Sequence, residues 1–247
     1  MYILLDANVT AAYYLPRCHR SKRVRDRIRT LFDSVRSGGT KHFFYLPNFC
    51  VAEVFSVFMK YSFGTWNQHV RADGTLDKRV YRSLVKQFEK DIHNGRFIYH
   101  YELSRYHVLA MNLVAPVDHY FQISRAKRTG KRKAIASPMG TFDHLIIAMG
   151  IHLAHIHGAD RVAVVSADRR LTQVLRKCRG GLPIATMRKL QLDRAETLTG
   201  RAFTPSSFPM AVNLATDTKA DLADVFGGWP LAQGSLACNA YRWERLT

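Results

Sequence analysis

The chain has 247 residues, 47% of them hydrophobic, with 37 Lys and Arg against 19 Asp and Glu and a formal net charge of +18. This length and apolar content exclude disorder throughout and allow one large domain or a domain with an extension. The basic excess favours a polyanionic partner, with nucleic acid first and an anionic membrane surface second, because it steers anions and releases counterions on binding.

Cysteine spacing and hydropathy bear on the cellular compartment. The four cysteines, at positions 18, 50, 178 and 238, form no C-x-x-C pair, so neither a zinc motif nor a redox motif is expected and reduced thiols fit best. No uninterrupted apolar run approaches the roughly 20 residues that span a bilayer. The first apolar run follows no basic residues and is interrupted by Asp6, so a secretory signal is not expected. We therefore predict a cytoplasmic protein that does not bind a membrane.

The first elements alternate between strand and helix. They are expected as a strand over 2–5, helices over 8–15 and 21–35, and a strand over 42–46. The first strand stops at Asp6, and Asn8 is a suitable cap for the helix that follows. The second helix has one apolar face and one face rich in Arg.

The middle of the chain is expected to be more helical. It comprises a helix over 49–61, a loop or lid over 63–75, a helix over 77–93, a strand over 96–101 and a helix from Ser104 that breaks or restarts near Pro116. The 49–61 helix is apolar all round except at Glu53 and Ser56, which predicts a mostly buried setting for the glutamate. Residues 125–133 are strongly basic and are expected to form an exposed loop.

The last clear pattern runs from residue 140 to about 190. It predicts a helix over 141–157, a strand over 161–165, a helix over 169–178 and a short strand over 183–187. Alternation of this kind indicates a parallel sheet with helices on both faces. We therefore expect a domain over 1–190 and, over 191–247, a C-terminal extension of uncertain structure with weak helical periodicity at 219–226.

Four acids stand apart because each ends, or is embedded in, an apolar element: Asp6, Glu53, Asp143 and Asp168. In an open α/β sheet the carboxyl ends of the strands form one ligand-binding edge, so all four can face one crevice. Each also has a structural interpretation. The three aspartates can cap helices or sit in a first turn, and Glu53 can form a buried ion pair with Arg or Lys.

Together the four acids suggest metal chemistry. Hard carboxylate oxygens suit Mg²⁺ or Mn²⁺. A pair of such ions can activate a water and stabilise the attacking and leaving oxygens of phosphodiester cleavage.

Four short segments are similar, in order and context, to the acidic motifs of PIN-domain ribonucleases. They are Leu5-Asp6-Ala7-Asn8, Val51-Ala52-Glu53-Val54, the run from Phe142 to Ala148, and the run from Val165 to Leu171. The resemblance covers about the first 190 residues. It implies a three-layer α/β/α sandwich with a central parallel sheet, bound Mg²⁺ or Mn²⁺, and endonucleolytic hydrolysis of RNA.

The resemblance also implies roles for single residues. Asp6, Glu53 and Asp143 would be the core catalytic metal ligands, and Asp168 a fourth acid acting directly or through water. Asn8 and Ser166 would be supporting polar groups. Some members of the family are toxins of toxin–antitoxin pairs, which makes an antitoxin or another protein regulator a candidate partner. The chain is longer than those compact members, which leaves its biological role and a homodimeric state open.

Basic residues on the second helix, in the basic segment and beside Asp168 are the expected RNA contacts. They are Arg23, Arg27, Lys127, Arg128, Lys131, Arg132, Lys133 and Arg169. The alternative is an ordinary solvated basic surface. A zinc site built from His144, His152, His155 and His157 is also conceivable, but their spacing lacks the glutamate-containing i, i+4 motif of helical zinc sites, which favours structural histidines.

The resulting hypothesis is a metal-dependent endoribonuclease. The alternatives are a non-cleaving RNA-binding scaffold with the same fold and a toxin held by an antitoxin that covers the acidic crevice.

Overall fold

The computed structural model describes residues 1–15, 21–63, 78–93, 97–129, 138–180, 182–190 and 208–234. Within these ranges the chain forms a five-stranded sheet in the order β3-β2-β1-β4-β5, and every neighbouring pair of strands is parallel. The strands are β1 (Tyr2–Leu5), β2 (Phe43–Pro47), β3 (Ile98–Tyr101), β4 (Val162–Ser166) and β5 (Met210–Asn213).

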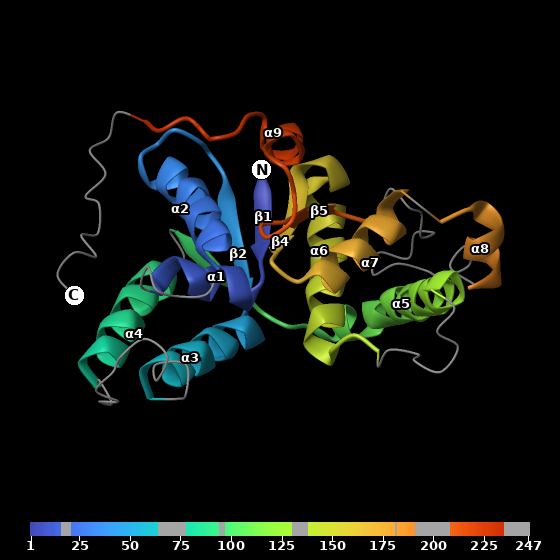
Figure 1. Ribbon diagram of the computed structural model, residues 1–247, viewed down its shortest axis with the longest axis horizontal. Helices are drawn as coiled ribbons and strands as arrows, with labels where there is room; N and C mark the ends of the chain where they lie inside the picture. The colour runs from blue at the N-terminus through green and yellow to red at the C-terminus, as the bar shows by residue number, and fades with distance from the viewer. Residues whose placement is uncertain are drawn as a thin grey trace.

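The helices occupy the segments between and after these strands (Figure 1). They are α1 (Ala7–Tyr14), α2 (Lys22–Arg36), α3 (Asn48–Phe63), α4 (Lys78–His93), α5 (Arg105–Thr129), α6 (Thr141–His157), α7 (Arg169–Gly180), α8 (Ile184–Lys189) and α9 (Lys219–Phe226), with a 3₁₀ turn, η1, at Ala159–Arg161. None of the helices in the described ranges has the length and apolarity needed to cross a membrane.

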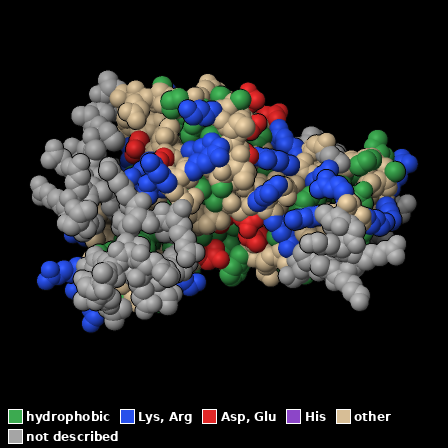
Figure 2. All heavy atoms as spheres, viewed as in Figure 1, with side chains coloured by type: hydrophobic (Ala, Val, Ile, Leu, Met, Phe, Trp, Pro, Cys, Tyr) green, Lys and Arg blue, Asp and Glu red, His purple; other side chains and the backbone are tan. Residues whose placement is uncertain are grey.

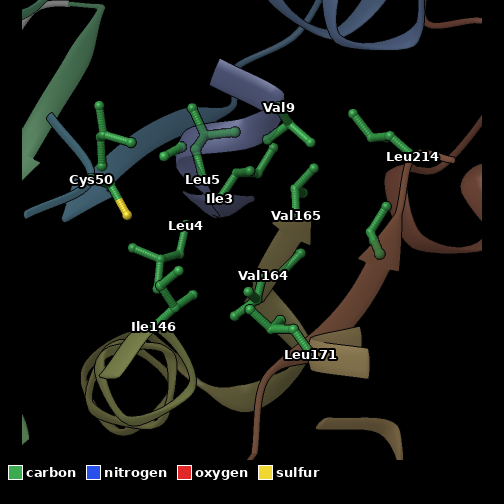
Figure 3. Packing of buried hydrophobic residues seen from close by; sticks show 14 of the residues in the cluster. Ile3, Leu4, Leu5, Val9, Cys50, Ile146, Val164, Val165, Leu171 and Leu214 are labelled. Carbon is green, nitrogen blue, oxygen red and sulfur yellow. The ribbon is translucent and has the colours of Figure 1, made fainter. Parts of the chain in front are cut away.

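Side chains of the central strand alternate between two helical layers. Ile3 and Leu5 point to the side of α1 and Val9, whereas Leu4 points toward Ile146 on α6 (Figure 3). All three β1 side chains are fully buried, as a strand covered on both faces requires. The predicted α/β/α sandwich with a central parallel sheet is therefore confirmed.

The connections reverse direction between β1 and β4, which are neighbours in the sheet. Such a switch point is where the loops that leave two adjacent strands diverge, so the carboxyl ends of β1 and β4 border a crevice. Leu5 pairs with Val165 in the register of the two strands, and the Asp6 N–H donates to the Val165 carbonyl at 3.0 Å. Asp6 and Ser166 are consequently held side by side at this edge.

Helix α5 differs from the sequence-based expectation. It continues through Pro116 to Thr129, so the predicted break is wrong and residues 125–128 form a last helical turn rather than the start of a loop. Leu113, Val114 and Val117 are buried around the proline, and this packing sustains the helix where the local sequence disfavours it. The expected loop residues from 130 to 133 lie outside the described ranges, as does the expected lid beyond Phe63.

The predicted strand over 183–187 is also wrong, because this segment forms α8, with Pro183 at its N-cap. Met187 is the buried residue of this short helix, and the position beside β4 is taken by β5 instead. Residues 208–234, which lie in the region expected to be an extension, therefore supply an edge strand of the sheet together with the predicted helix at 219–226.

Helix α6 approaches β4 closely at Gly150. A Cβ atom at this position would lie 2.7 Å from Cγ2 of Val164 and 3.0 Å from Cγ of Pro209. Both distances are shorter than an ordinary van der Waals contact, so a residue larger than glycine would push α6 away from β4. This packing also sets the position of the first turn of α6, where Asp143 lies.

We expect Gly150→Ala to lower the free energy of unfolding by about 1–3 kcal/mol, because the added methyl overpacks the core. Gly180→Ala in α7 is the matched control. A Cβ there meets no atom within 4 Å, so this substitution should leave stability unchanged or slightly raised. Urea unfolding of both variants gives the comparison, and equal stabilities would contradict the close approach of α6 to β4.

Candidate metal centre

Asp6 is a buried carboxylate at the carboxyl end of the central strand. Asp6 is only 5% exposed. It occupies the N-cap position of α1, but its side chain makes no capping hydrogen bond by geometric criteria. Instead, Oδ2 accepts a hydrogen bond of 2.5 Å from Oγ of Ser166, the last residue of β4. The shortest contact of this carboxylate is therefore with the neighbouring strand β4 rather than with its own helix.

Glu53 reaches the same edge from α3. This helix begins directly after β2, so Cys50 and, one turn later, Glu53 come close to Asp6. One ligand atom from each of Asp6, Cys50 and Glu53 lies within 4.8 Å of the other two. Glu53 is half-buried, less enclosed than its apolar helix suggested, and among the described Lys and Arg residues none forms an ion pair with it.

Asp143 lies in the first turn of α6, after the N-cap Gly140. Its carboxylate turns back toward that glycine, and Oδ2 would lie 3.2 Å from a Cβ at position 140. Burial raises the pKa of this half-buried carboxyl, and the Gly140 N–H offsets part of the rise. Asp143 thus has the first-turn role expected of an acid. Its ligand atoms are not among those that lie within 4.8 Å of one another in the Asp6–Cys50–Glu53 cluster, but its charge acts on the carboxyls of Asp6 and Glu53.

Asp168 caps α7. Its Oδ1 accepts from the N–H groups of Arg170 at 2.5 Å and Leu171 at 3.0 Å, and its own N–H donates to Ser166 Oγ at 2.8 Å. The capping interpretation is therefore confirmed for Asp168. Ser166 links this cap to Asp6, since the same hydroxyl contacts both residues.

The acids raise one another's pKa values. Burial, together with the charges of Asp143 and Glu53, raises the pKa of Asp6 to about 7, against the lowering effect of the Ser166 hydroxyl and the Asn8 N–H. Burial, and then Asp143, raise the pKa of Glu53. Burial, and then Asp168, raise the pKa of Asp143. The four carboxylates thus form one electrostatically linked group.

This group fits a divalent cation. Clustered, partly desolvated carboxylates repel one another unless a positive charge lies among them, and their oxygens suit Mg²⁺ or Mn²⁺. The Cys50 thiol lies beside them, but burial and the neighbouring carboxylates raise its pKa well above the usual value. The donors at neutral pH are therefore mainly oxygen. Cys50 is a member of the cluster that the sequence pattern did not single out.

Two asparagines hold the backbone around Asp168. The Asn8 side chain accepts from the Ala167 N–H at 3.1 Å, as its expected supporting position suggests. Asn213, at the end of β5, donates to the Asp168 carbonyl at 3.0 Å. Asn213 was not predicted, although it is a polar residue that ends an apolar run, as Asp6 is.

Asp118 is a second buried acid that sequence reasoning missed. It lies on α5 at 1% exposure and accepts from Arg170 Nη2 at 2.9 Å and from the Met139 N–H at 2.9 Å. Burial alone would raise its pKa, but the Met139 N–H and the Arg170 guanidinium outweigh burial and lower it. Asp118 thereby ties α5 to the segment before α6 and to the first turn of α7.

The predicted RNA contacts fall into two groups. Arg27 is buried and donates to the Leu214 carbonyl at 2.9 Å, and the exposed Arg23 donates to the Asp217 carbonyl at 2.9 Å. The guanidinium groups of both residues are thus held by backbone carbonyls of the segment that follows β5. Lys127, Arg128 and Arg169 are exposed.

A basic groove runs between α5 and α7. Its volume is about 620 Å³, and it is lined by Phe121, Arg125, Arg128, Arg169, Arg170, Gln173, Arg176, Lys177 and Gly180. Figure 2 shows Lys and Arg side chains gathered over these helices. Two of the predicted RNA contacts thus line this groove. Lys131, Arg132 and Lys133 lie outside the described residues.

The helical histidines have separate partners. His144 lies 3.7 Å from Asp118, His152 contacts His107 at 2.9 Å, and the His157 ring stacks on Tyr2. This supports the structural interpretation over a zinc site formed by this helix.

Comparisons with known proteins add little. No family model matches the chain, and no curated protein matches it. Among solved structures, the complex of VapBC2 from Rickettsia felis with a DNA fragment from their promoter is similar to it, with 11% sequence identity and a TM-score of 0.39. The similarity covers 70% of this chain and 93% of that chain. A likeness this distant supports no inference about activity.

Burial of Asp6 predicts how stability depends on pH without metal. The folded-state pKa of about 7 lies above the ordinary value of 3.8, so between these values the folded protein binds more protons than the unfolded chain. Stability should therefore fall as pH rises from about 4 to 7, by at most about 4 kcal/mol from this group. Asp6→Asn should flatten the fall and be more stable than wild type at pH 8.

The measurement is urea unfolding at several pH values in EDTA. Asp224→Asn, on the exposed side of α9, is the control and should keep the wild-type slope. Identical slopes for wild type and Asp6→Asn would show that Asp6 does not have the raised pKa.

Removal of the Asp118 carboxylate should destabilise the folded protein. Asp118→Ala removes the buried carboxylate that accepts from the Arg170 guanidinium and from the Met139 N–H, which we expect to lower the free energy of unfolding by about 3 kcal/mol. Asp160→Ala removes a carboxylate that is 91% exposed and pairs with Arg179, and it should change stability little. Denaturant titration of both variants tests this, and similar losses would remove Asp118 from its proposed role.

Proposed function

We propose that the protein is a metal-dependent endoribonuclease that hydrolyses RNA phosphodiester bonds. The observation that supports this most is the convergence of Asp6, Glu53 and Asp143 at the switch point of the sheet, with a raised pKa for each. Such an arrangement is unfavourable for the protein alone. It becomes favourable when a divalent cation lies among the carboxylates.

The residues have distinct proposed roles. Asp6, Glu53 and Asp143 would hold Mg²⁺ or Mn²⁺, and the ion would supply activation of a water and stabilisation of the departing oxygen. Asp168, whose Oδ1 is engaged by two backbone N–H groups, would contribute mainly negative charge. Ser166 orients Asp6, and Asn8 orients the turn before Asp168.

RNA is the substrate class that the charge favours. The net charge of +18 and the arginines between α5 and α7 suit a polyanion. The acids argue against the alternative of a non-cleaving scaffold, because uncompensated carboxylates would repel phosphates at the place where a scaffold should bind them. We place the activity in the cytosol, where the buried free thiols of Cys50 and Cys178 stay reduced.

A protein regulator would act most directly by covering the acidic crevice, as an antitoxin does for a toxin. Growth arrest on expression, relieved by a co-expressed neighbouring gene product, would distinguish this role from routine RNA processing.

The direct test is cleavage of varied RNAs with Mg²⁺ or Mn²⁺. Asp6→Asn and Asp143→Asn should each lower the rate by about 100-fold or more, because each removes a ligand charge needed in the transition state. Asp224→Asn should cleave like wild type, and chelation with EDTA should abolish cleavage.

Both acid variants must first show the fold of the wild type by circular dichroism. Wild-type rates for the two folded variants would sink the proposed mechanism. Salt-dependent RNA binding with no cleavage of any RNA would favour the scaffold.

A further inference from the structure

A partly exposed pair of phenylalanines lies close to Glu53 and Asp143 in the sequence. The rings of Phe49 and Phe142 stack with centroids 5.0 Å apart and an interplanar angle of 16°. Phe142 directly precedes Asp143 in α6, and Phe49 lies one turn before Glu53 in α3. Phe142 is nearly half exposed, at 48%. Phe49 is partly buried and packs against the core, so it supports the exposed ring of Phe142 beside the acids.

On another side, the acids adjoin the basic groove between α5 and α7. The residues of α7 that line the groove are Arg169, Arg170, Gln173, Arg176, Lys177 and Gly180. All of them except Arg170 follow one helical face. The first of them follows Asp168 directly, so the groove begins at the acids. A helix of this length is about 18 Å long, which matches about five nucleotides of a stacked strand at about 3.4 Å each.

The charge in the groove is of one sign. Of the described residues that line it, none is acidic. Arg125, Arg128, Arg169 and Lys177 are exposed, and the exposed Arg176 also pairs with Asp217 at 2.6 Å. Figure 2 shows the same arrangement on the surface. Acidic and hydrophobic side chains lie together near the middle of the view, where α3 and α6 approach each other, and basic side chains extend from there over α7 and α5.

We propose that the Phe49–Phe142 pair is a base-stacking subsite, on which an unpaired base of the RNA stacks beside the cut while the phosphates follow the basic groove. This inference rests on the proposed nuclease function and narrows its substrate. Aromatic rings bind the face of any base, provided that the base is not already stacked within a helix. A paired duplex can therefore make the phosphate contacts in the groove, but it cannot make the stacking contact with the aromatic pair. Stacking of one base on the pair would determine which phosphate lies beside the carboxylates. It would do so for any base, because stacking does not depend on the identity of the base.

The test is equilibrium binding in EDTA, where cleavage cannot occur. The probes are a fluorescent 12-nucleotide single-stranded RNA and the fully paired duplex of the same sequence. Phe142→Ala should weaken binding of the single strand about tenfold and leave duplex binding unchanged, while Phe142→Tyr should bind like wild type. Ile156→Ala is the control, because Ile156 is an apolar residue of the same helix, 57% exposed, about 21 Å from Phe142 along the axis.

Two further measurements separate stacking and charge from structural damage. The fluorescence of 2-aminopurine placed in the single strand should be quenched by wild type and by Phe142→Tyr, but not by Phe142→Ala. Arg128→Ala with Lys177→Ala should weaken binding of both RNAs and reduce the slope of log K against log salt by about 0.7 per lost contact on the single strand. The proposal would be overturned if Phe142→Ala bound the single-stranded RNA as tightly as wild type and quenched the 2-aminopurine fluorescence to the same extent.

Failure of this proposal differs from failure of the nuclease function. If cleavage depends on Asp6 and Asp143 but single-strand binding ignores Phe142, only the substrate inference is wrong. If binding depends on Phe142 as stated but cleavage ignores both acids, the binding path stands and the proposed catalytic site is wrong.

Discussion

The burial of the Asp6 carboxylate is the constraint on which the rest of the site depends. Parallel pairing of β1 with β4 fixes Ser166 against it, and the 2.5 Å hydrogen bond from that hydroxyl offsets only part of the desolvation, since the pKa of Asp6 is still raised to about 7. A neutral residue would fit this position at lower free energy. The charges of Glu53 and Asp143 contribute to this rise in pKa and favour the neutral form, so this arrangement does not stabilise the fold by itself, which is the basis of the proposed cation site.

The helices at this edge explain how several acids can gather without unfolding the protein. Helices α3, α6 and α7 all begin on the crevice side of the sheet, and helix N-termini favour negative charge. Asp168 uses this effect directly through two backbone N–H groups. Asp118 holds Arg170 and the segment before α6 in place from α5. The pKa of Asp118 is lowered, whereas those of Asp6, Glu53 and Asp143 are raised.

Hydrophobic periodicity predicted the layers of the fold and most elements before residue 180, because strands buried on both faces and amphipathic helices leave clear local patterns. The same reasoning brought Asp6 to a strand end and Asp143 to a first helical turn. It missed features that depend on distant partners. The helix through Pro116, the edge strand β5, the buried Arg27 and the Asp118–Arg170 pair are determined by tertiary packing. Cys50 was missed because a cysteine in an apolar helix has the pattern of a core residue.

The central claim is that the carboxylates at the switch point hold a divalent cation, and diffraction from crystals soaked in Mn²⁺ tests it most directly. The anomalous signal should give a peak within about 2.2 Å of carboxylate oxygens of Asp6 and of Glu53 or Asp143, and the peak should be lost in crystals of Asp6→Asn. No manganese at this edge, together with ion pairs from Lys or Arg to these acids, would contradict the account.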